Sequence, residues 1–196
     1  MTAYANLVQD FPGRCLKLLN TLDTSSRCLG LEVTMMLSIA SSGLIVPMER
    51  LGPNHPSSDK DAFPGASTAI NSLLSMRFVK SPLVLNGGAS WKYGQSDLGA
   101  WGTEPDGWSR VSMDSQDVRQ ILSVIRNVLA HGNIYSKSVG ADKQIGEIVF
   151  ASKKTNRSYL GCGCVKYEEV GMQHVTTTPA AFSHLLRTWL QGLAKT

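Results

Sequence analysis

Apolar residues recur at helical spacing in five segments of this chain, and no other feature limits its fold as strongly. Side chains three, four and seven positions apart share one face of a helix, so each segment predicts a helix that buries that face. The five segments are residues 11–22, 29–43, 66–79, 114–131 and 178–193. Asp114 and Asp117 suit the start of the fourth helix, and Gly132 suits its end. Thr178 can cap the last helix, whose first residue is then Pro179.

Two segments near the C-terminus have the composition of strands. They are "QIGEIVFAS" (144–152) and "SYLGCGCVKYEEV" (158–170), and the "KKTNR" between them (153–157) suits a turn. Residues 81–112 are rich in Gly, Pro, Ser and Trp and show no sustained period, which predicts a long loop or a pair of short strands. We therefore expect a mainly α fold, a helical bundle with a small β-hairpin before the C-terminal helix. It would form a single domain over residues 1–196, with 81–112 as a long loop insertion.

The composition is that of a folded, mildly basic protein. The chain has 196 residues, of which 42% are hydrophobic and 17% are charged, and this balance suits one domain with a buried core. The formal net charge of +4 permits a polyanionic partner such as RNA but does not require one. No signal peptide is evident, and the longest apolar stretch (29–46) contains Glu32, which is costly inside a bilayer. We therefore expect a cytoplasmic protein without a membrane anchor.

The cysteines and most histidines do not suggest a metal site. Cys162 and Cys164 are separated by a single glycine, which is not the two-residue gap that zinc sites favour. We expect reduced thiols, as is usual in the cytosol, and no metal or other cofactor. His55, His174 and His184 are expected to be structural or surface groups.

Three polar side chains gather near the end of the fourth predicted helix, in "SVIRNVLAHGNIYS" (123–136). At 100° per residue, Arg126 lies at the edge of the apolar stripe, about 80° from Val118. Asn127 and His131 lie on the far side and are neighbours at i and i+4. Arg126 and His131 are about 140° apart. They can meet on one ligand only through a distorted last turn or a partner surface.

The chemistry of these three groups has two interpretations. A histidine can move protons near neutral pH, a guanidinium can hold a phosphate, and an amide can orient either one. Together Arg126, Asn127 and His131 suffice for cleavage of RNA without a metal, in which the 2′-hydroxyl attacks the adjacent phosphate. The alternative is that Arg126 and His131 only complement the dipole at a helix end. On that alternative, replacing His131 by alanine would leave every activity unchanged.

The stretch "RNVLAH" (126–131) resembles the hallmark motif of the HEPN superfamily, the higher eukaryotes and prokaryotes nucleotide-binding domains. That motif is an arginine, a polar residue and a histidine four to six residues beyond the arginine, at a helix end. Here four residues separate Arg126 from His131, and Asn127 fills the polar position. A longer part of the sequence resembles a bacterial and plasmid-borne HEPN family. It consists of "ILSVIRNVLAHGNIY", with "LEVTMMLSIASSGLIVPMERL" upstream and "EIVFAS" downstream. The likeness covers most of the chain and is weakest over residues 81–112.

The resemblance implies a homodimeric ribonuclease with an all-helical core. Two motif helices would meet at a two-fold axis and line one composite cleft. Arg126 would stabilise the scissile phosphate, His131 would act as base or acid, and Asn127 would orient them. The products would be a 2′,3′-cyclic phosphate and a 5′-hydroxyl, with no metal required. Bacterial relatives act as toxins or in defence, so an antitoxin or another protein partner is possible. The alternative is a catalytically silent HEPN module that binds RNA, a nucleotide or a protein.

Basic residues follow the motif and offer a path for an RNA backbone. The segment from residue 131 to residue 166 has more Lys and Arg than Asp and Glu. Lys137, Lys153, Lys154 and Arg157 are the predicted RNA-binding residues, because cations along a strand can track phosphates. A solvated hairpin explains the same charges equally well.

Overall fold

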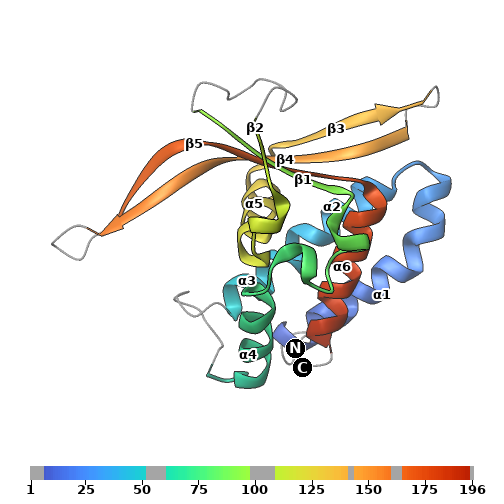
Figure 1. Cartoon of the computed structure of the whole chain (residues 1–196). Helices are drawn as coiled ribbons and strands as arrows, with labels where there is room; N and C mark the ends of the chain where they lie inside the picture. The colour runs from blue at the N-terminus through green and yellow to red at the C-terminus, as the bar shows by residue number, and fades with distance from the viewer. Residues whose placement is uncertain (1–6, 52–60, 98–108, 141–143, 160–164, 195–196) are drawn as a thin grey trace.

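The computed structural model describes residues 7–51, 61–97, 109–140, 144–159 and 165–194 (Figure 1). Its helices are α1 (Leu7–Cys28), α2 (Glu32–Gly43), α3 (Ile45–Arg50), α4 (Pro64–Leu74), α5 (Val118–His131) and α6 (Pro179–Ala194), with short 3-10 helices η1 (Phe78–Lys80), η2 (Asn86–Gly88) and η5 (Met113–Ser115). Its strands are β1 (Trp91–Ser96), β2 (Ser109–Val111), β3 (Ile134–Val139), β4 (Gln144–Tyr159) and β5 (Val165–Thr177).

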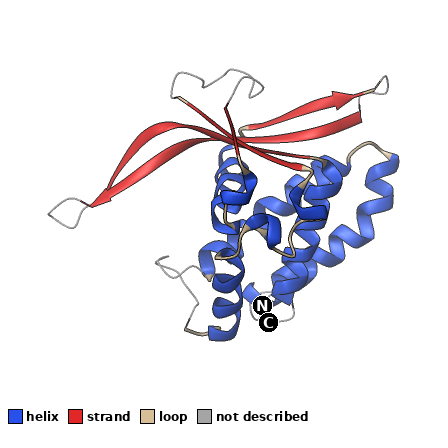
Figure 2. Cartoon of the chain, viewed as in Figure 1, coloured by secondary structure: helices blue, strands red, loops and turns tan. Residues whose placement is uncertain are grey.

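The strands form one five-stranded antiparallel sheet in the order β2-β1-β5-β4-β3. The helices gather on one face of this sheet, so the molecule has a helical layer and a sheet layer (Figure 2). The prediction of a helical bundle with a β-hairpin before the C-terminal helix is therefore confirmed in part, because the sheet is larger than expected and the fold is mixed α/β. The expected hairpin corresponds to β4 and β5, and three further strands flank it.

Residues 81–112 are not one long loop, which corrects the predicted loop insertion. They supply η2, β1 and β2, and residues 98–108 between the two strands lie outside the described ranges. The alternative of two short strands is the one that the structure confirms. β1 pairs with β5, so this segment is built into the sheet beside the C-terminal strand.

The predicted position of the hairpin turn, at residues 153–157, is also wrong. Residues 153–157 continue β4 instead of turning, and they pair with β5. The outer part of this hairpin projects beyond the helices in Figure 1. Its described side chains are exposed on both strands, for example at Asn156 and Tyr167. A strand that meets solvent on both faces lacks alternation of apolar and polar residues, so its polar sequence looks like a turn.

The predicted helical stripes form the core. Every stripe residue of α6 is buried, and the indole Nε1 of Trp189 donates a hydrogen bond to the Gly43 carbonyl oxygen at 2.9 Å. Phe150 of β4 packs against Phe182 of α6, with ring centroids 5.2 Å apart. Phe78 packs edge-on against Trp91 at 5.1 Å. The core thus lies between the helices and one face of the sheet.

Several helix boundaries differ from the prediction. α1 begins before Pro12, which lies inside it, and the third predicted helix ends at Leu74, so Phe78 falls in η1. The fourth helix begins at Val118, because Asp117 is its N-cap and Asp114 lies in η5. The predicted end at Gly132 and the cap from the Thr178 hydroxyl to the Ala181 N–H, at 3.3 Å, are confirmed.

No helix in the described ranges is long and apolar enough to cross a membrane. The predictions for His55, Cys162 and Cys164 concern residues outside the described ranges.

Candidate functional site

Both ends of α5 are fixed by local hydrogen bonds. The Asp117 carboxylate accepts from the Gln120 backbone N–H at 2.7 Å, and the Gln120 side chain accepts from the Asp117 N–H at 2.9 Å. At the other end Gly132 adopts a left-handed φ of 76°, and its N–H donates to the Val128 carbonyl oxygen at 2.7 Å. The apolar face of α5 between these caps packs against the sheet and α2. The predicted site residues therefore occupy the last two turns of a firmly placed helix.

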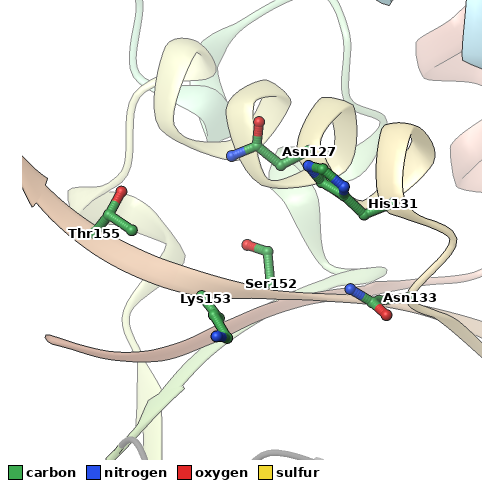
Figure 3. A pocket seen from close by; sticks show the side chains of 6 residues that line it. All are labelled: Asn127, His131, Asn133, Ser152, Lys153 and Thr155. Atoms are coloured by element: carbon green, nitrogen blue, oxygen red, sulfur yellow. The ribbon is translucent and has the colours of Figure 1, made fainter. Parts of the chain in front are cut away.

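A pocket of about 380 Å³ lies between the C-terminal half of α5 and strand β4 (Figure 3). It is lined by Asn127, His131, Asn133, Ser152, Lys153 and Thr155. Asn127 is half-buried and His131 is exposed, and both lie on the side of α5 that faces β4. The turn at Gly132 sends the chain into β3, which pairs directly with β4. This connection holds the end of the helix over the strand and creates the pocket.

Arg126 is not among the residues that line this pocket. Its guanidinium donates a hydrogen bond to the Glu49 carboxylate of α3 and another to the Asn127 amide oxygen, the latter at 2.9 Å. The Arg126 and Glu49 side chains are 34% and 31% exposed, so the pair is open to solvent. The structure thus brings Asn127 and His131 into one pocket, and a hydrogen bond to Asn127 links Arg126 to them. This agrees with the separation of Arg126 and His131 around the helix.

The predicted RNA-binding lysines have partners within the sheet. Lys153 contributes to the pocket wall, but its ammonium bonds both carboxylate oxygens of Glu169, at 2.7 and 2.9 Å, and its side chain points away from α5 in Figure 3. Lys154 donates to the Gln95 amide oxygen at 3.1 Å. Both ammonium groups thus bond acceptors, Glu169 and Gln95, that do not line the pocket.

The other two predicted RNA-binding residues lie far apart in the sheet. Lys137 is on β3 opposite Glu147, and Arg157 is on β4 opposite Tyr167. The first belongs to the β3–β4 hairpin and the second to the projecting part of the β4–β5 hairpin. The four residues therefore do not form one continuous stripe.

Three residues of the pocket were missed by the sequence analysis: Asn133, Ser152 and Thr155. Nothing in their local sequence marks them, because Ser152 and Thr155 reach α5 through the pairing of β3 with β4. Glu49 was missed for a similar reason, since it lies 77 residues before Arg126. Asn133 directly follows Gly132, where an asparagine is typical of a turn and does not by itself indicate a site.

The remaining described histidines lie outside this pocket. His174 is buried on β5 against Gly94, where an added Cβ would come within 2.1 Å of the ring. His184 of α6 lies with Nε2 3.1 Å from the Pro82 carbonyl oxygen. Both positions suit the structural roles predicted for them. Among the described residues, no three of His, Cys, Asp and Glu are grouped so that they could hold a metal ion.

Comparison with known protein families gives a match that covers residues 1–191. The matching family is described as HEPN pEK499 p136. Neither the curated proteins nor the solved structures gave a significant match. The family match spans α1 to α5, the sheet, both walls of the pocket and most of α6, and it bears out the resemblance that the sequence suggested. The chain therefore belongs to the HEPN pEK499 p136 family.

Proposed function

We propose that this protein is a metal-independent endoribonuclease of HEPN type. One observation carries the proposal: Asn127 and His131 of the motif helix line a pocket whose opposite wall is polar. An exposed histidine beside a space of about 380 Å³ can exchange protons with a bound ligand. Arg126 does not line the pocket, but it donates a hydrogen bond to Asn127, which does.

In the proposed reaction a histidine removes the proton from a ribose 2′-hydroxyl. The resulting oxygen forms a bond to the adjacent phosphorus, the bond from phosphorus to the 5′-oxygen breaks, and that oxygen receives a proton. The products are a 2′,3′-cyclic phosphate and a 5′-hydroxyl. Arg126 stabilises the negative charge that builds up on the phosphate, as guanidinium groups do. No oxidant, metal or further reactant is needed for the balance.

Two copies of the chain would complete the site. Arg126 and His131 diverge around α5, so one copy does not direct both groups at a single phosphate. A two-fold axis would place His131 of each copy near Arg126 of the other. A guanidinium has five N–H donors, and Glu49 and Asn127 each accept from one of its nitrogens, so donors remain for a phosphate.

The test is cleavage of a labelled single-stranded RNA in EDTA, with analysis of the product ends. We expect wild type to give cyclic-phosphate ends, and His131→Ala and Arg126→Ala to cleave at least about a hundredfold more slowly. His131 is exposed, so its replacement should change the free energy of unfolding by no more than about 0.5 kcal/mol. His184→Ala, a histidine variant outside the pocket, is the matched control and should cleave as wild type does.

A binding module without catalysis is the second candidate. The ion pair between Glu49 and Arg126 favours this second candidate. The Glu49 carboxylate partly neutralises the guanidinium that would stabilise the transition state. Failure of wild type to cleave a broad panel of RNAs, together with retained binding of RNA, would support this candidate over the enzyme.

We also propose a cellular role as a toxin or defence effector that acts on RNA in the cytoplasm, with an antitoxin or other protein partner. Induced expression should arrest growth with wild type and not with His131→Ala. Equal growth of the two strains at equal protein levels would contradict this role.

A further inference from the structure

A chain of hydrogen-bonded side chains crosses the helix-facing side of the sheet and ends at the pocket. Lys154 Nζ donates to the Gln95 amide oxygen at 3.1 Å, and Gln95 Nε2 donates to the Tyr93 hydroxyl at 2.7 Å. The Tyr93 hydroxyl donates to the Gln173 amide oxygen at 3.1 Å. Gln173 Nε2 donates to the Ser152 hydroxyl oxygen at 3.3 Å. We call these five residues the sheet network.

The register of the sheet places this network on the same face as the core. Tyr93 lies opposite Val175, and Val175 lies opposite Phe150, which packs on α6. Two residues along each strand, Gln95, Gln173 and Ser152 form the next row. Residues two apart on a strand share a face, so this row points toward the helices. The network therefore connects β1, β5 and β4 beneath α5.

One charged group fixes the direction of every hydrogen bond in the network. The two ends of an amide are hard to tell apart from their shape alone. An ammonium can only donate, so Lys154 must face the oxygen of Gln95. The nitrogen of Gln95 then faces Tyr93, and the Tyr93 proton goes to Gln173. Burial raises the pKa of Tyr93, while its hydrogen bond with Gln95 lowers it, and the phenol stays protonated as this order requires.

Ser152 receives the last of these hydrogen bonds and still has a proton to give. The residue is 6% exposed and lines the pocket. Gln173 occupies one lone pair of its oxygen, so the hydroxyl hydrogen points elsewhere. Within the described part of the chain, that hydrogen has no acceptor. Figure 3 shows the Ser152 side chain rising from β4 toward α5, where Asn127 and His131 lie.

We propose that Ser152 donates its hydroxyl hydrogen to a non-bridging oxygen of the RNA phosphate bound in this pocket. The inference rests on the proposed function and adds a group that the motif does not contain. His131 acts on the ester oxygens of that phosphate from one wall, so the phosphate lies between the walls and Ser152 meets it from the other. Lys154 is a positioning residue that acts through the network, and it does not contact the RNA.

This assignment changes what is expected of Lys154. A lysine that contacts the RNA backbone makes binding depend on salt, because it releases a counterion. A lysine that fixes a network affects turnover and leaves the salt dependence of binding unchanged. Lys154→Met should therefore lower the cleavage rate and keep the salt slope of wild type.

The test uses RNA with a single phosphorothioate at the scissile phosphate, as each of its two diastereomers. Sulfur accepts hydrogen bonds poorly, so wild type should be slowed by one diastereomer more than by the other. Ser152→Ala should cleave unmodified RNA about ten- to a hundredfold more slowly and should lose that diastereomer preference. Ser152→Cys, which keeps the shape of the side chain but donates weakly, should behave similarly.

Lys154→Met should be slowed about fivefold on unmodified RNA, with a reduced diastereomer preference, and Lys154→Arg should restore both. Lys92→Met is the matched control, since Lys92 bonds Glu147 at 2.6 Å and is outside the network. It should show the rate and the preference of wild type. An unchanged preference in Ser152→Ala and Ser152→Cys would overturn the inference while leaving the ribonuclease intact.

A binding measurement tests the Ser152 contact independently of cleavage. If wild type does not cleave, binding of 2′-O-methyl oligonucleotides that carry either phosphorothioate diastereomer is compared by fluorescence anisotropy. A preference that wild type shows and Ser152→Ala lacks would support the Ser152 contact without catalysis. Equal binding by the two proteins would overturn it.

Discussion

Arg126 shares its guanidinium between the Glu49 carboxylate and the Asn127 amide. A bound phosphate would compete with Glu49 for the same group. At the scale of single residues, the ion pair of Arg126 with Glu49 therefore determines how much positive charge α5 presents to RNA.

Replacing Glu49 by glutamine should tighten RNA binding about two- to fivefold at low salt, because it removes a competing negative charge. The change is measured by anisotropy with a 2′-O-methyl oligonucleotide. Asp23→Asn is the matched control, since it makes the same change in net charge on α1, where Asp23 bonds Arg27 at 3.2 Å. Weaker binding by Glu49→Gln would mean that Glu49 holds Arg126 in its working position.

Cys15 should react slowly with iodoacetamide. Burial raises the pKa of its thiol, so at neutral pH less of it is the reactive thiolate, and its rate should rise as the pH rises. Exposed Cys28 should react about tenfold faster or more, as followed by peptide mass spectrometry. In urea the two rates should become similar. Equal rates in the folded protein would contradict the burial of Cys15.

At the scale of elements, Gly132 fixes where α5 ends and where β3 begins. A Cβ at Gly132 would meet no atom within 4 Å, so the cost of Gly132→Ala comes from the left-handed φ of 76° alone. We expect a loss of about 1 kcal/mol in the free energy of unfolding by urea.

Gly192 of α6 is the matched control for Gly132. A Cβ there also meets no atom within 4 Å, and the residue lies within a helix. Gly192→Ala should therefore stabilise the protein by about 0.5–1 kcal/mol. If both variants destabilised the protein equally, the left-handed cap would not explain the effect at Gly132.

The helices could be predicted from the sequence because each buries a stripe that is continuous along the chain, as α5 and α6 do. The helix caps at Gly132 and Thr178 could be predicted because they depend only on residues close by in the sequence. β3 was missed because it is short and contains two serines. β1 was expected only as an alternative to a loop, because it contains Gly and pairs with β5, which lies far away in the sequence. The motif residues were found from the α5 sequence, whereas Ser152 and Glu49 meet them only through tertiary contacts.

At the scale of the whole molecule, the proposed composite site predicts complementation between two inactive variants. Arg126→Ala and His131→Ala should each be inactive alone. A mixed dimer would contain one site with an intact arginine from one chain and an intact histidine from the other. Random mixing at equal amounts should therefore restore about a quarter of the wild-type cleavage rate.

The control for complementation is a mixture in which both preparations carry His131→Ala, and it should stay inactive. No recovery from well-mixed dimers would place Arg126 and His131 of one chain in the same site. A strictly monomeric protein by light scattering would also contradict the composite site.

The order of strands in the sheet determines when the pocket can form during synthesis of the chain. β5 lies between β1 and β4, although it follows β1 by about 80 residues, and α6 packs on α1 at the other end of the chain. At a translation rate of roughly 5–20 residues per second, β5 is synthesised about 4 to 16 seconds after β1. The wall of the pocket that contains Ser152 is complete only when β5 has joined β4. A chain whose β5 has not yet been made therefore lacks this wall of the pocket, and the ribosome that makes it is not exposed to the finished site until β5 has emerged.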